Sequence, residues 1–122
     1  MRLTRDHTVA SGARPMTMAP LVDVSASAVD LTHIITNSLG AVGSTGPLID
    51  IERFRILDGD RILVCSNGLT DAIHGDFIAT VLSSSLSPEE QAGRLIAAAE
   101  EADARDDATA VVAHYKIPGN RG

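Results

Sequence analysis

Residues 59–71 read GDRILVCSNGLTD, in which a short apolar strand runs straight into a polar turn that contains glycine. The strand, Arg61 to Cys65, carries Ile, Leu and Val side chains that a core can bury. The turn presents Ser66, Asn67 and Asp71 at the end of this rigid element. Oxygen-bearing side chains gathered where a buried strand ends are typical of a cation or phosphate site. The same spacing suits a plain strand-to-helix turn with capping residues, so both interpretations stay open.

The segments on either side of this stretch predict an α+β fold, because strands and helices mix without regular alternation. Ser87, Pro88 and Glu90 predict a helix start with a capping box. We expect one domain over residues 1–122, with an irregular segment 1–30 and a sheet-and-helix core 31–118. The expected strands are His33 to Leu39, Ile49 to Ile56, Arg61 to Cys65 and Thr109 to Ile117, and the expected helices are Asp76 to Leu82 and Ser87 to about Ala102.

The composition is that of a small acidic globular domain. The chain has 122 residues, of which 44% are hydrophobic and 21% charged, which suffices for a core and is unlike a disordered chain. A net charge of −6 and the scarcity of aromatic residues disfavour a nucleic-acid partner. The chain has one cysteine, no long apolar run and no signal segment, so we expect a cytoplasmic protein without a membrane partner.

A second group of oxygen ligands lies at the mouth of the last expected strand, at Asp106 and Asp107. A turn, a helix and a strand separate them from Asn67, and such a passage can bring two strand ends side by side in one sheet. Asp106 and Asn67 would then meet at one edge, as a hard divalent cation such as Mg²⁺ or Mn²⁺ requires. A single pair of such residues has low specificity. Cys65 is better explained as a core residue, and the histidines as surface or capping residues.

Four ordered motifs resemble the C-terminal half of the metal-dependent protein phosphatase 2C family. Leu3 to Thr8 resembles that family's "lTrDHs" segment, and His33 to Gly40 is similar to its "hvlTraLG" strand. Residues 59–71 resemble "GDrlLLcSDGLtD", and Asp106 to Val112 resembles "DNvTvvv". The order and spacing of all four agree, and together they cover Leu3 to Ile117.

The resemblance implies a fold, a reaction and a site. The family fold is an antiparallel β-sandwich flanked by helices. Its members are serine/threonine phosphatases, hydrolases in which a binuclear Mg or Mn centre activates a water that attacks phosphorus in line. By position Asp106 matches a metal carboxylate, and Asn67 stands where the family usually has another. The residues that would support this site are Asp107, Gly68, Ser66 and Asp71, and no catalytic residue outside the metal ligands falls in this half.

Three departures from the family pattern weaken the expected activity. Asn67 replaces an aspartate, so its neutral oxygen should hold a divalent cation more weakly. Asp107 stands where the family has asparagine and adds a charge beside Asp106. The family's N-terminal half, with the metal-bridging aspartate and the phosphate-binding arginine, has no counterpart, so we expect a truncated chain that needs a complementary chain or self-association to cover its sheet.

Two classes of function therefore stay open. The first is a metal-dependent phosphatase acting on phosphoprotein substrates, incomplete or weak as an isolated chain. The second is a non-catalytic phosphatase-like module that binds a partner or dimerises. A truncated gene product with no function of its own is a third, plainer alternative. Manganese-dependent hydrolysis that Asp106→Ala abolishes would distinguish the first from the others.

Overall fold

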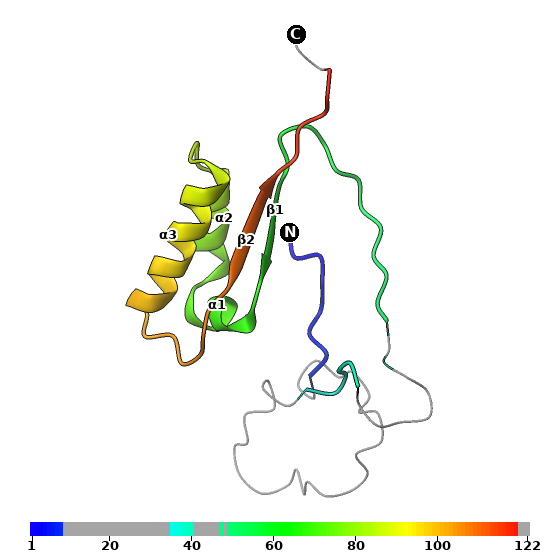
Figure 1. Ribbon diagram of the computed structural model, residues 1–122, viewed down its shortest axis with the longest axis vertical. Coiled ribbons are helices and arrows are strands. Elements are labelled where there is room, and N and C mark those ends of the chain that lie inside the picture. The colour runs from blue at the N-terminus through cyan, green and yellow to red at the C-terminus, as the bar shows by residue number, and fades with distance from the viewer. Residues whose placement is uncertain (9–34, 41–46, 48, 120–122) are drawn as a thin grey trace, which may run out of the picture. The chain divides into compact units, whose positions relative to one another are not determined.

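The computed structural model describes residues 1–8, 35–40, 47 and 49–119 of the chain. They fall into two compact units, Met1–Phe54 and Arg55–Gly122, and each unit is described by itself below. The helices and strands of the described residues all belong to the second unit (Figure 1). In chain order they are β1 (Arg61–Cys65), α1 (Asn67–Ala72), α2 (Gly75–Ser83), α3 (Pro88–Glu101) and β2 (Ala110–His114).

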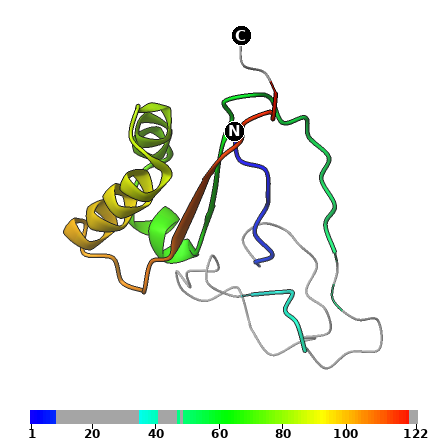
Figure 2. The same cartoon turned by 45° about the horizontal axis from the view of Figure 1, so that its top comes forward.

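The two strands form an antiparallel sheet with helices on one side. Leu63 of β1 lies opposite Val112 of β2, and both pack against the core. The next pair in the register, Val64 and Val111, points away from the helices and is 65% and 59% exposed. Figure 2 shows α2 and α3 on the same side of the ribbon formed by β1 and β2. This arrangement confirms the α+β class and the expected strand over residues 61–65.

Both helices expected from the sequence are present, as α2 and α3. Ser87 Oγ accepts a hydrogen bond from the Glu90 backbone N–H at 3.2 Å, and Glu90 Oε2 accepts one from the Ser87 N–H at 2.8 Å. With Pro88 in the first turn, this is the predicted capping box, and α3 ends one residue before the expected position. α2 extends the expected helix by one residue at each end. His74 caps it by accepting a hydrogen bond from Asp76 N–H.

The SNGLTD stretch forms a helix, α1, where a turn was expected. The reason is the burial of Leu69, which is 0% exposed and lies in the core with Val81, Leu95 and Ala99. An open turn at this position would leave the Leu69 side chain in water, at a cost of about 1.5–3 kcal/mol. Packing of Leu69 therefore selects the helix, which begins directly after Ser66.

Gln91 is a buried polar residue that the sequence did not reveal. It is 0% exposed, and its amide nitrogen lies within hydrogen-bond distance of three carbonyl oxygens at the end of α2. Its Oε1 lies 2.8 Å from Nε2 of His114 on β2. Because Gln91 Oε1 can only accept, His114 Nε2 is the donor. This one side chain ties α2, α3 and β2 together through Val81, Leu82, Ser84 and His114.

A turn precedes β1, and β1 pairs with β2, not with the residues before this turn. Leu57 O accepts from Asp60 N–H at 3.1 Å, and Gly59 adopts a φ of 86°, which favours glycine. Gly59 N–H then donates to Tyr115 O, which extends the pairing with the end of β2. Residues 49–56, expected as a strand, have no regular secondary structure. Their alternating isoleucines find no apolar surface among the described residues, as the exposed fractions of 78% and 79% at Ile49 and Ile51 show.

The first unit is organised around the Asp50 carboxylate. Asp50 accepts hydrogen bonds from Arg5 Nε at 2.8 Å and Nη2 at 2.7 Å, and it lies 2.8 Å from His7 Nε2. These bonds, that from Arg5 first and that from His7 second, hold the pKa of Asp50 well below its usual range. The expected strand from His33 to Leu39 is reduced to a single bridge between Thr8 and Ile35. Residues 33 and 34 lie outside the described part.

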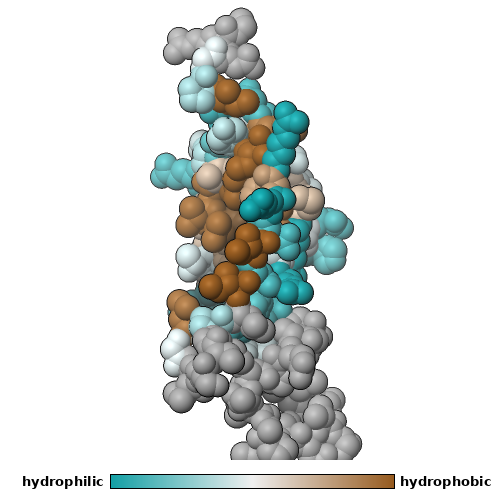
Figure 3. Space-filling model, turned by 90° about the vertical axis from the view of Figure 1, so that its right-hand side faces the viewer, coloured by the Kyte–Doolittle hydropathy of each residue, from teal (hydrophilic) through white to brown (hydrophobic). Residues whose placement is uncertain are grey.

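Several apolar side chains are exposed, and Figure 3 shows hydrophobic surface on the face that it presents. In the second unit they include Val64, Val111, Tyr115 and Ile117. The alternation of the strands puts Val64 and Val111 on the outer sheet face, opposite the core. No helix in the described residues has the length and apolar character that crossing a membrane requires.

Candidate functional site

The candidate site begins where β1 passes into α1. Ser66 N–H donates to Thr109 O at 3.0 Å, and Ser66 Oγ accepts from Thr109 N–H at 3.0 Å. The same hydroxyl lies 3.3 Å from Asp107 O and donates to it. The pairing of Cys65 with Ala110 sets this register. The backbone segments that carry Asn67 and Asp106 therefore lie at the same end of the sheet. That the two side chains share a cation stays a prediction.

Gly68 permits a close approach between α1 and the loop before β2. A Cβ atom at this position would lie 2.4 Å from Asp107 O and 3.1 Å from Asp106 O. No side chain fits at such distances, so glycine is required for these backbones to touch. Asn67 starts α1 beside this contact. The contact brings the SNGLTD segment against the two aspartates.

Asn67 and Asp71 interact along one face of α1. Asn67 Nδ2 lies 3.2 Å from Asp71 Oδ2. An ionised carboxylate only accepts hydrogen bonds, so the amide presents its NH₂ group to Asp71. The amide oxygen of Asn67 therefore points away from the Asp71 carboxylate and is an uncharged acceptor.

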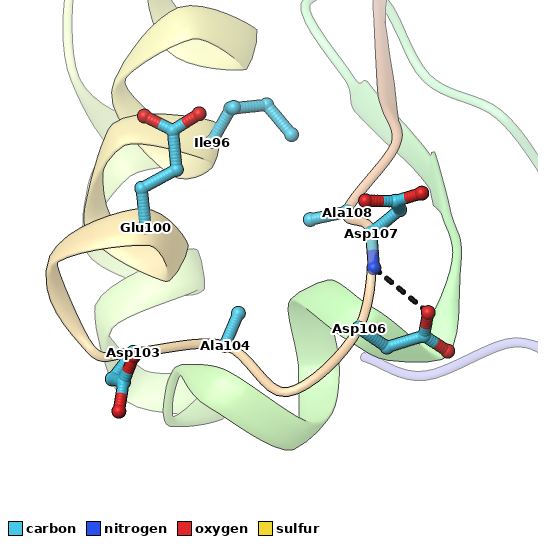
Figure 4. Close-up of a pocket in the computed structure, with 7 residues that line it drawn as sticks. All are labelled: Ile96, Glu100, Asp103, Ala104, Asp106, Asp107 and Ala108. Atoms are coloured by element: carbon cyan, nitrogen blue, oxygen red, sulfur yellow. Dashed lines mark hydrogen bonds between the residues drawn. The ribbon is translucent and has the colours of Figure 1, made fainter.

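Asp106 is engaged within its own loop. Its Oδ1 accepts a hydrogen bond from the Asp107 N–H at 2.8 Å, which is the dashed line in Figure 4. One oxygen of the Asp106 carboxylate is therefore already engaged by the backbone of its own loop.

A pocket of about 460 Å³ lies beside this loop, between it and the end of α3. Figure 4 shows Ile96 and Glu100 on α3, Ala104 on the loop that follows the helix, and Ala108 across from them. The lining combines apolar residues with four acidic ones, Glu100, Asp103, Asp106 and Asp107. In Figure 4 the carboxylates of Asp103 and Asp106 point away from the pocket. Sequence reasoning missed Glu100 and Asp103, although the acidic run from Glu100 to Asp107 was a visible signal.

The described residues do not fit a binuclear metal centre by themselves. Asn67 offers one neutral oxygen, and one oxygen of Asp106 already accepts from the backbone. Within the described part of the chain, no group of three or more His, Cys, Asp or Glu side chains could hold a metal ion. Mg²⁺ and Mn²⁺ prefer several carboxylate oxygens. Any such centre would need ligands from elsewhere.

Comparisons with known proteins point to one class. A protein of Streptococcus pyogenes serotype M6 that carries the name of a 2C-type protein phosphatase is 28% identical over 113 residues, which is 92% of this chain and 44% of that protein. A solved serine/threonine phosphatase of S. agalactiae has a similar fold, with a TM-score of 0.67 and 26% identity over 94% of this chain and 46% of that one. No family model matches the sequence.

Over most of its length the chain therefore resembles 2C-type serine/threonine phosphatases in both sequence and fold, as its four motifs indicated. It spans less than half the length of each of these two relatives. The roles of Asp106, Asn67 and the supporting residues remain predictions, because neither comparison identifies ligands.

Proposed function

We propose that this chain contributes part of a 2C-type serine/threonine phosphatase and hydrolyses phosphoesters weakly or not at all by itself. The observation that carries the proposal is the match over more than nine-tenths of the chain to a phosphatase in both sequence and fold. The substrate class follows from the solved relative, which is a serine/threonine phosphatase. The substrates of the assembled enzyme are then phosphoproteins.

The cation of the assembled enzyme is proposed to be Mg²⁺ or Mn²⁺. From this chain Asp106 would supply a carboxylate and Asn67 a neutral oxygen, with Asp107 beside them. Support comes from the close contact of Gly68 with the backbone of residues 106 and 107, which puts both ligand candidates at one end of the sheet. The remaining carboxylates must come from outside the part of the chain that the structure describes.

A complementary chain or a second copy is proposed to cover the outer face of the β1–β2 sheet. Val64 and Val111 lie opposite each other there and are more than half exposed. We further propose that the protein works in the cytoplasm, where its one cysteine, Cys65, stays reduced.

The test is hydrolysis of a phosphothreonine peptide in millimolar Mn²⁺, by the chain alone and by the chain fused to the part of the S. agalactiae phosphatase that it does not cover. We expect little or no turnover from the chain alone and measurable turnover from the fusion. Asp106→Ala should abolish that turnover, and Asp58→Ala, on the turn before β1, is the control for a carboxylate outside the site.

The alternative function, a non-catalytic phosphatase-like module, is favoured by Asn67 at a ligand position. The same assay distinguishes it. A folded fusion that shows no turnover even after Asn67→Asp would support the binding module and contradict the phosphatase.

A further inference from the structure

At the start of α1, the side-chain amide of Asn67 faces the carboxylate of Asp71. Asn67 and Asp71 are one helical turn apart, so the helix itself holds their side chains together. Their contact, 3.2 Å from Nδ2 to Oδ2, puts N–H groups against negative charge. Two carboxylates at these positions would repel each other.

Two oxygens of the neighbouring loop, Asp106 Oδ1 and Asp107 O, also accept hydrogen bonds from donors of this chain. Asp106 Oδ1 accepts from the Asp107 N–H at 2.8 Å, and Asp107 O accepts from Ser66 Oγ at 3.3 Å. Together with Asp71 Oδ2, three oxygens of α1 and of the loop before β2 each accept from a donor of this chain. A divalent cation that bound any one of these oxygens would have to displace or crowd its donor.

From this geometry we infer that the Asn67 side-chain amide takes the place of a divalent cation at the start of α1. The chain then folds and holds α1 against residues 106–109 without Mg²⁺ or Mn²⁺. The inference rests on the proposed function only in locating the phosphatase site at this junction. It concerns the isolated chain, and metal binding in an assembled enzyme depends on ligands from elsewhere.

The substitution Asn67→Asp should convert this junction into one that depends on a cation. It would set two carboxylates one turn apart on α1, beside the Asp106 and Asp107 carbonyl oxygens that face Gly68. Like charges at this spacing destabilise a helix. Mn²⁺ relieves such repulsion by binding both carboxylates. Asn67→Ala is the matched control, because it removes the donor without adding a charge.

Thermal unfolding followed by circular dichroism, in EDTA and in millimolar MnCl₂, tests the inference. For the unaltered chain we expect midpoints that agree within about 1 °C in the two conditions. Asn67→Asp should have a lower midpoint in EDTA and recover by on the order of 5 °C in Mn²⁺. Asn67→Ala should have a lower midpoint that Mn²⁺ does not change.

Either of two results would overturn the inference: a clear rise of the unaltered chain's midpoint in Mn²⁺, or a folded Asn67→Asp variant that does not respond to Mn²⁺. If that variant fails to fold, the electron paramagnetic resonance signal of free Mn²⁺ decides. An undiminished signal beside the unaltered chain supports the inference, and its loss refutes it. Phosphatase activity is not read in either measurement, so the result is separate from that for the proposed function.

Discussion

At Gly68, the start of α1 touches the backbone of the loop that carries Asp106 and Asp107. Replacing it by alanine would put a Cβ 2.4 Å from Asp107 O, a backbone atom that cannot move without shifting the loop. We expect Gly68→Ala to lower the free energy of unfolding by about 1–3 kcal/mol. Urea denaturation measures the change.

Gly93 supplies the control for that substitution. It lies in α3, and a Cβ there would meet nothing within 4 Å. Gly93→Ala should therefore raise stability by about 0.5–1 kcal/mol through helix propensity. Equal effects at the two glycines would show that the contact at Gly68 is not close.

His114 should make stability depend on pH. Partial burial is the first cause that lowers its pKa, and the positive charges of Arg61 and Lys116 follow. Arg61 Nε lies 3.2 Å from His114 Nε2. Because that nitrogen already donates its proton to Gln91 Oε1, we interpret the Arg61 contact as a repulsive approach of charge and not as a hydrogen bond.

A lowered folded-state pKa means that the unfolded chain takes up the proton more readily. Stability is therefore fully present above the ordinary histidine pKa of about 6.5 and falls as the pH drops below it. Urea midpoints at pH 7.5 and 5.5 should differ less in His114→Gln than in the unaltered chain. An identical pH dependence in both would assign the effect to another group.

At the scale of elements, α3 depends on its capping box. Removing the Ser87 hydroxyl leaves the Glu90 N–H without its acceptor. We expect Ser87→Ala to cost about 1 kcal/mol, measured by urea denaturation. Ser85→Ala, at an exposed serine in the same connector, should change stability by much less, and equal losses would argue against the cap.

The capping box also shows which elements the sequence can predict. α3 was correct at its start because Ser87, Pro88 and Glu90 act within one turn, without help from the rest of the fold. α1 was missed because its helical state depends on Leu69 reaching the core. The strand expected at 49–56 was wrong because alternating apolar residues form a strand only where they can bury one face, and Ile49 and Ile51 remain exposed.

Only part of the candidate site could be predicted from the sequence, because some of its contacts depend on the rest of the fold. Asn67 and Asp106 were expected to meet because both follow or precede a strand, and the Cys65–Ala110 pairing brings their segments together. The hydrogen bond from Asn67 to Asp71 and the role of Gly68 depend on α1 being a helix, which the sequence did not indicate. Glu100 and Asp103 join the pocket only through the turn that follows α3.

At the scale of the whole molecule, the open face of the sheet should cause association. Val111 is 59% exposed on that face and lies opposite Val64. In sedimentation velocity we expect the chain to form higher species as concentration rises, because apolar surface is then removed from water. Val111→Lys should shift the distribution toward monomer, with Glu101→Lys at the exposed end of α3 as the control. A clean monomer at all concentrations would contradict the proposed covering of this face.

The central claim is that Asp106 and the β1–α1 junction belong to a phosphatase site. The most direct measurement is the rate of phosphothreonine-peptide hydrolysis in Mn²⁺ by the fusion of this chain with the missing part of the S. agalactiae phosphatase. We predict turnover that Asn67→Asp increases and that Asp106→Ala lowers by at least about 100-fold, since loss of a ligand exceeds the usual effect of losing one of its supporting residues. Turnover unchanged by Asp106→Ala, in a fusion shown to be folded by circular dichroism, would contradict the claim.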